Sequence, residues 1–219
     1  MQKGRMMLIP YQQIIQKYNL QIKTILHVGA HLAEERDDYF NNGCSKVVWI
    51  EANPDLITKL KTSLNAQQNI VLNYAVSDID DQDISFKITN NGQSSSILDL
   101  AEHAHIYPTI FVEKEVELKT KTLKTLFSEN NLDMQEIDMI NLDIQGAELL
   151  ALKGAGDGLS TMKAIYTEIN IKELYKDCAL IYELDEYLSK YDFVRVETCL
   201  DNSGTWGDAL YIKGECNVK

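Results

Sequence analysis

The chain has few cysteines, and their positions argue against two common uses of this residue. Cys44, Cys178, Cys199 and Cys216 are scattered through 219 residues and form no C-x-x-C pair. Disulfide frameworks and structural zinc sites depend on characteristic cysteine spacings. We therefore expect free thiols in a reducing compartment, which favours a cytoplasmic protein.

Long apolar runs and positive charge are also scarce. No run approaches the roughly 18 residues of a membrane span, and the N-terminus lacks the apolar core of a signal peptide. The 33 Asp and Glu residues outnumber the 21 Lys and Arg residues, so the net charge is −12. A surface of this sign repels the phosphates of nucleic acids. The composition predicts a soluble protein whose partners include neither membranes nor nucleic acids.

The complete glycine loop of dinucleotide-binding proteins is missing as well. An apolar run over residues 24–28 ends at Gly29 like a buried parallel strand, but the turn holds one of the three glycines of G-x-G-x-x-G. A second apolar run, 47–50, ends in Glu51, and a carboxylate at this spacing can bind both hydroxyls of a ribose. The pattern predicts a nucleotide-binding βαβ unit without a pyrophosphate, which favours S-adenosylmethionine (SAM). An ordinary βα turn with a surface glutamate is the alternative.

Hydrophobic periodicity predicts alternating helices and strands along the chain. Helices are expected at 10–18, 32–42, 55–65, 123–129, 147–153 and 179–190. Strands are expected at 24–28, 47–50, 70–76, 84–88, 116–119, 137–144, 164–169, 193–198 and 208–213. No linker or repeat divides the chain, so we predict one domain over 1–219, with 1–22 as a helical extension and 23–213 as the core.

Six blocks of sequence carry a resemblance to a known family. They lie in order at 25–31, 50–54, 74–78, 94–97, 141–148 and 206–211, and the Asp-x-x-Gly-Ala-Glu of 143–148 is the most specific. With these blocks, the chain resembles the FkbM-type family of SAM-dependent methyltransferases. The resemblance implies an α/β class I methyltransferase fold, which is a Rossmann-like, doubly wound sheet of six parallel strands and one antiparallel strand with helices on both faces. It also implies methyl transfer from SAM, commonly to a hydroxyl of a small-molecule or glycan acceptor.

The resemblance assigns the cofactor site by position. The implied residues follow the first three strands: Gly29, Ala30, Glu51, Ala52, Ala75 and Val76. The first two would line the methionine part of SAM, Glu51 would hold the ribose, and the last two would border the adenine.

One position departs from the family pattern. Where the family often has an aspartate that helps to hold the amino group of SAM, this chain has His27, so Glu34 or Asp143 would have to compensate. His27 also fits a buried strand histidine. The departure keeps open an alternative function, a methyltransferase-like scaffold that binds SAM weakly or not at all.

Acidic residues end two neighbouring strands at the sheet edge where ligands of α/β proteins bind. An alcohol is a poor nucleophile that needs a base, and we expect Asp143 as that base with Glu168 as its orienting partner. His105 is the reserve base, because histidine titrates near neutrality. The loops 93–96 and 103–107 are expected to recognise the acceptor. Methylation of an amine, which needs no strong base, is a further possibility.

Histidine spacing predicts no metal site. His27 and His31 lie four residues apart, but across a strand and a turn rather than on one helix, where this spacing would align two ligands. A magnesium site at Asp143 with Glu168 or Asp208 would suit some O-methyltransferases, and the sequence does not decide it.

Overall fold

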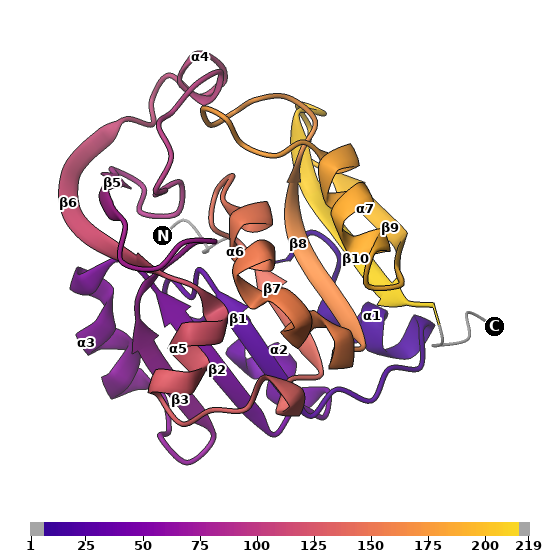
Figure 1. Cartoon of the computed structure of the whole chain (residues 1–219). Coiled ribbons are helices and arrows are strands. Elements are labelled where there is room, and N and C mark those ends of the chain that lie inside the picture. Colours follow the sequence, from indigo (N-terminus) through magenta and orange to yellow (C-terminus); the bar gives the residue numbers. More distant parts are fainter. Residues whose placement is uncertain (1–6, 215–219) are drawn as a thin grey trace.

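A seven-stranded sheet forms the centre of the computed structural model, which describes residues 7–214 (Figure 1). Its strand order is β3-β2-β1-β7-β8-β10-β9. The strands are β1 (Thr24–Val28), β2 (Lys46–Glu51), β3 (Asn69–Asn73), β7 (Met139–Leu142), β8 (Ala164–Asn170), β9 (Phe193–Leu200) and β10 (Trp206–Lys213). Six of these strands run in the same direction and β10 runs antiparallel to them, which confirms the predicted class I methyltransferase sheet. Residues 1–6 of the predicted extension, and Cys216, lie outside the described residues.

Helices cover both faces of this sheet because its central strands are apolar on both sides. All residues of β7 and β8 are buried. On one face the core includes α5 (Leu123–Glu129), α6 (Glu148–Ala155) and α7 (Ile181–Ser189). On the other it includes α1 (Tyr11–Lys17), α2 (Arg36–Asn41) and α3 (Pro54–Ser63). Within residues 7–214, no helix has the length and apolar character needed to cross a membrane.

The chain leaves the main sheet after β3, which corrects the strand predicted at 70–76. That segment splits at Tyr74 into β3 and β4 (Ala75–Val76), and β4 pairs with β6 (Val112–Lys121) in a second sheet of order β4-β6-β5. The strand predicted at 84–88 is β5 (Asp83–Thr89), and the one predicted at 116–119 is the middle of β6. Most residues of β6 are polar and half of them are exposed, so hydrophobic periodicity reveals little of its length.

Two other predicted elements are shorter than expected. The helix predicted at 32–42 is confined to α2, because His31 and Ala33 have positive φ angles of 43° and 58° that no helix contains. The strand predicted at 137–144 is β7, since the chain turns after Leu142. The segment 97–111, for which the sequence predicts no helix or strand, is irregular apart from the short α4 (His103–Ile106). Figure 1 shows α4 at the end of the molecule toward which β8 runs.

Candidate active site

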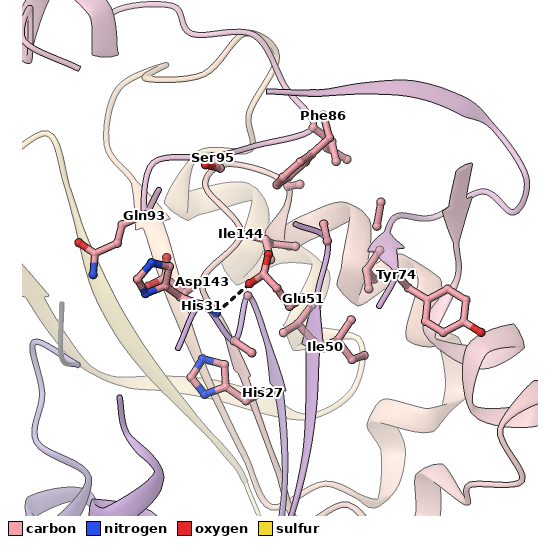
Figure 2. A pocket seen from close by; sticks show the side chains of 18 of the residues that line it. His27, His31, Ile50, Glu51, Tyr74, Phe86, Gln93, Ser95, Asp143 and Ile144 are labelled. Carbon is pink, nitrogen blue, oxygen red and sulfur yellow. Dashed lines mark hydrogen bonds between the residues drawn. The ribbon is translucent and has the colours of Figure 1, made fainter. Parts of the chain in front are cut away.

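A cavity opens at the carboxyl ends of β1, β2 and β7, and we call it the cofactor cavity (Figure 2). Every residue predicted from the sequence to bind the cofactor lines it: His27, Gly29, Ala30, Glu34, Glu51, Ala52, Ala75, Val76 and Asp143. The loop after β5 closes its other side through Gly92, Gln93, Ser95 and Ile97. The topology therefore gathers turns that lie far apart in the sequence around one open space.

Gly29 is the residue that lets the first turn pass close to the end of β7. Its φ is +91°, and a Cβ atom there would lie 1.9 Å from the carbonyl oxygen of Asp143. The amides of Gly29 and Ala30 both donate to the carbonyl of Ile50, at 2.9 and 3.0 Å, which ties this turn to β2. No side chain other than hydrogen fits this backbone, so the single glycine of the motif is a requirement of the fold.

Glu51 presents a fixed carboxylate to the cofactor cavity. Its Oε1 accepts from the amide of Asn53 at 2.7 Å and its Oε2 from the amide of His31 at 2.8 Å, the bond drawn in Figure 2. Burial to 7% exposure raises the pKa of this carboxyl, and the two amide bonds work in the opposite direction. Each carboxylate oxygen has a second lone pair, so the group can still accept bonds from two ribose hydroxyls.

His27 is both a buried strand histidine and part of the cavity wall. The side chain is 2% exposed, its Nδ1 lies 3.1 Å from the hydroxyl of Tyr39, and its ring lies 4.9 Å from that of Trp49. Burial lowers the pKa of His27 to about 4, so the imidazole is neutral at pH 7. A neutral ring does not attract an ammonium group as an aspartate would.

Other carboxylates line the same wall. Glu34 lies there, but its Oε1 is 2.7 Å from Nδ1 of His31 and its Oε2 accepts from the amide of Leu32. Glu35, which the sequence analysis did not single out, lines the cavity beside it, as does Asp143. These acids can supply the negative charge that His27 lacks.

Gln145 joins the two carboxylates predicted to be catalytic. Its Nε2 donates to Oδ1 of Asp143 at 2.7 Å and to Oε2 of Glu168 at 2.5 Å. Its Oε1 accepts from the hydroxyl of Tyr175 at 2.6 Å. Asp143 and Glu168 thus meet as the strand order predicts, but through the amide of Gln145, a residue inside the 141–148 block to which the sequence assigned no role.

A second cavity, which we call the acceptor cavity, adjoins the first. It is lined by Asn91, Gln93, Ser94, His103, Tyr107, Ile110, Gln145, Glu168, Leu174, Tyr175 and Trp206. Gln93 lines both cavities. Each cavity contains one of the two carboxylates predicted to be catalytic: Asp143 lines the cofactor cavity, and Glu168 lines the acceptor cavity.

The two loops predicted to recognise the acceptor both contribute to this cavity, through Gln93 and Ser94 and through His103 and Tyr107. His105, the predicted reserve base, is exposed and lines neither cavity. Tyr175 was missed because nothing in its local sequence distinguishes it. Trp206, in contrast, opens one of the six family blocks and could have been singled out on that basis.

Glu148, the last residue of the most specific block, shapes the turn between β7 and α6. Its carboxylate accepts from the amides of Ile144 at 3.0 Å and of Gly146 at 3.0 and 3.2 Å. It is fully buried, and this burial raises the pKa of the carboxyl. Glu148 therefore acts at the start of α6 and holds Gln145 in place between the two acids. Among residues 7–214, no cluster of three or more His, Cys, Asp and Glu side chains has the geometry of a metal site.

Comparison with known proteins agrees with this geometry. A family model described as the methyltransferase FkbM domain matches residues 27–195. The 2-O-methyltransferase NoeI of Sinorhizobium fredii is 29% identical over 101 residues, which are 46% of this chain and 41% of that protein. The chain therefore matches less than half the length of this relative.

Solved structures were also compared, and one of them shares the fold at low identity. A protein of the NADB-Rossmann superfamily from Streptococcus agalactiae aligns with a TM-score of 0.52 at 13% identity, covering 96% of this chain and 71% of that one. Magnesium protoporphyrin IX methyltransferase from Synechocystis PCC 6803, solved with bound SAM, aligns at 0.48 and 9% identity over 96% and 86% of the two chains. Because the family model spans more than half of the sequence and the cavity residues suit the cofactor, the chain belongs to the FkbM-type family of SAM-dependent methyltransferases.

Proposed function

We propose that the chain transfers the methyl group of SAM to a hydroxyl oxygen of a small-molecule or glycan acceptor. The observation that carries this proposal is that two cavities meet at Gln93, which lines both of them. Between them lie Asp143 and Glu168, which are both hydrogen-bonded to the side-chain amide of Gln145. Methyl transfer is an in-line displacement, in which the acceptor atom must lie about 3 Å from the methyl carbon and behind it. Two adjoining cavities with acids between them suit this requirement.

The cofactor cavity suits SAM in three ways. Glu51 offers a carboxylate to the ribose, and Ala75 and Val76 offer a small apolar wall to the adenine. Gly29 allows a ligand to approach the backbone closely. Bound there, SAM supplies the electrophilic methyl group, and the residues of the chain only orient it.

The positions of the two acids favour Glu168 as the residue that meets the acceptor. Glu168 lines the acceptor cavity and accepts a hydrogen bond from Gln145, which fixes one of its oxygens. We propose that this carboxylate takes the proton of the acceptor hydroxyl, a role that can contribute about 10²–10⁴-fold in rate. Asp143 then serves on the cofactor side. The prediction from the sequence, with Asp143 as base and Glu168 as its orienting partner, is the competing assignment.

The lining of the acceptor cavity favours a hydroxylated ring as acceptor. Trp206 and Tyr107 offer aromatic rings to apolar C–H surfaces, and Gln93 offers an amide to hydroxyls. The name of the relative from Sinorhizobium fredii, a 2-O-methyltransferase, also favours oxygen over nitrogen. We further propose that residues 23–213 act as a single methyltransferase domain.

Incubation with SAM and matched panels of alcohols, glycosides, amines and RNA tests this function. Mass spectrometry of the products should show methyl ethers. Methylated amines or RNA would instead assign the enzyme to another acceptor class. A chain that binds SAM no more tightly than millimolar and modifies nothing would be the scaffold that His27 leaves open.

A further inference from the structure

The backbone amides of the turn after β1 are all engaged within the protein. Each amide of residues 29–33 donates to an oxygen atom of the chain itself. The acceptors are the carbonyls of Ile50 and Ala30 and the carboxylates of Glu51 and Glu34. A ligand group that needs a hydrogen-bond donor at this turn must therefore find it on a side chain.

His31 supplies such a donor. Its side chain is 25% exposed and lines the cofactor cavity, and its Nδ1 lies 2.7 Å from Oε1 of Glu34. Its Nε2 has no hydrogen-bond partner among residues 7–214 and lies near Gly92, where a Cβ atom would be 3.4 Å from it. Figure 2 shows the ring on the side of the cavity where Gln93 lies. Because Glu34 engages Nδ1, Nε2 is the ring nitrogen that can meet a ligand.

Acids dominate the charged residues that line the cofactor cavity, namely Glu34, Glu35, Glu51 and Asp143. They suit the sulfonium and the ammonium of SAM but repel its carboxylate. Among residues 7–214, no lysine or arginine lines this cavity, and the buried His27 is neutral at pH 7. A carboxylate that binds among acids needs a charged donor as its partner.

We infer that His31 binds the carboxylate of the methionine part of SAM through Nε2, and that Glu34 is a positioning residue that holds the ring of His31. This inference rests on the part of the proposed function that puts SAM in the cofactor cavity. It also changes the role of Glu34, which the sequence analysis considered as a partner of the ammonium. Asp143, the other acid considered for that role, is then the partner of the ammonium.

The electrostatics of the turn favour a charged donor. Burial alone would lower the pKa of His31, but the hydrogen bond to Glu34 outweighs burial, and the pKa lies above its usual value. Glu51 and Asp143 also face the ring and raise its pKa. The loop 89–96, which approaches Nε2, contains no charged residue. The ring therefore stays protonated to a higher pH than a free histidine, and charged hydrogen bonds are roughly twice as strong as neutral ones.

Decarboxylated SAM isolates this contact, because it keeps the sulfonium and the ammonium and lacks only the carboxylate. In calorimetry at pH 6.5, the wild type should bind it about 10–100-fold more weakly than SAM, the range for a hydrogen bond to a charged group. His31→Asn tolerates the positive φ of 43° and keeps a polar atom near Nδ1, but it has no atom at the position of Nε2. It should lose about 10–100-fold in SAM affinity and nothing in affinity for decarboxylated SAM.

His31→Gln separates charge from position, since its amide reaches the position of Nε2 but does not titrate. SAM should bind this variant more tightly than it binds His31→Asn. The advantage of the wild type over His31→Gln should shrink as the pH rises from about 6 to 9, because the imidazolium loses its proton. The amino group of SAM titrates at about pH 8 with both proteins, so only the difference between them is compared.

Glu34→Gln tests the positioning residue. It keeps an acceptor for the ring and for the amide of Leu32 but removes the charge that raises the pKa of His31. The advantage of the wild-type histidine should then be lost at lower pH, while the affinity for decarboxylated SAM should not change. A loss of affinity for decarboxylated SAM would overturn this role and restore Glu34 as the partner of the ammonium.

Each outcome for His31 decides the inference. Equal affinity of the wild type for SAM and decarboxylated SAM, or equal losses for both ligands in His31→Asn, would overturn it, while the proposed function would stand. If SAM binds through His31 but no acceptor is methylated, the proposed function fails and the inference stands. Binding of neither ligand would overturn both. Thermal melting reports whether each variant folds, and the two ligands compared on the wild type decide the inference if His31→Asn does not.

Discussion

The two cavities of this protein are built in different ways. The cofactor cavity is lined largely by short continuous stretches, 27–31, 50–52 and 74–76, that follow consecutive strands. The acceptor cavity is assembled from residues that lie far apart in the sequence, such as His103 of α4, Gln145, Tyr175 and Trp206 of β10. The first depends on strand order and the second on how loops pack. Cofactor chemistry is therefore visible in the local sequence, whereas acceptor chemistry emerges only in three dimensions.

The largest expected effect separates the two acids that lie between the cavities. Glu168→Gln keeps the shape of the side chain and a hydrogen-bond acceptor for Gln145, but it removes the base. We expect turnover to fall by about 10²–10⁴-fold with SAM affinity unchanged. Asp143→Asn is the matched variant and should weaken SAM binding more than it slows the methyl-transfer step. Single-turnover kinetics and calorimetry measure both, and the reverse pattern would restore Asp143 as the base.

The next effect concerns the free energy of unfolding and its dependence on pH through His27, which lies in the wall of the cofactor cavity. Because the folded-state pKa of His27 is about 4, against about 6.5 in an unfolded chain, the unfolded chain binds more protons between these values. The contribution of His27 to stability is full above pH 6.5 and is lost as the pH falls toward 4, by roughly 3 kcal/mol in total.

Urea unfolding of the wild type and His27→Asn at pH 7.5 and 5 measures this contribution. Asparagine does not titrate but keeps a polar atom for Tyr39. The burial that raises the pKa values of Glu51 and Glu148 acts with the opposite sign in both proteins, so only the difference between the proteins is compared. The same dependence on pH in both would show that His27 does not titrate as its burial requires.

A smaller effect tests the ribose contact. Glu51→Ala should weaken SAM binding by about 1.5–3 kcal/mol, the range for hydrogen bonds to a charged group, and should leave glycoside binding in the other cavity unchanged. Glu51→Gln retains one acceptor oxygen and should lose less. Calorimetry with SAM provides the numbers, and equal affinities in all three proteins would remove Glu51 from the cofactor site.

The smallest effect tests the hydrogen bond from Tyr175 to Gln145, the residue that bonds both acids. Tyr175→Phe removes the hydroxyl that donates to Gln145 but keeps the ring in the acceptor cavity. One net hydrogen bond is worth about 0.5–1.5 kcal/mol, so we expect turnover to fall by up to about tenfold at unchanged SAM affinity. Steady-state kinetics would contradict this role if the variant matched the wild type.

Hydrophobic periodicity predicts the strands and helices whose side chains are buried in a regular pattern. The buried strands and amphipathic helices of the main sheet show their periodicity directly, and Leu123–Glu129 is a helix with the predicted bounds. The break at Tyr74 is invisible in an apolar run, because β3 and β4 differ in their partners and not in their composition. Strand β6 is hidden for the opposite reason, since most of its side chains are polar and half of them are exposed.

Some residues of the candidate site are likewise predictable from the local sequence, and others are not. Gly29 and Glu51 are predictable because a positive φ and a fixed carboxylate leave a clear mark on the sequence. Two histidines two residues apart carry no such mark, and only packing decides that His103 lines the cavity while His105 is exposed. Measuring the turnover of His105→Ala tests its predicted role as the reserve base, which requires a loss of turnover.

The central claim is that the first cavity binds SAM and not a dinucleotide. Calorimetry of the wild-type protein with SAM, S-adenosylhomocysteine and NAD tests it most directly. We expect micromolar binding of SAM and of S-adenosylhomocysteine and no heat from NAD, because the turn at Gly29 lacks the further glycines that a pyrophosphate needs. Binding of NAD with no response to SAM would show instead that the cavity is a dinucleotide site.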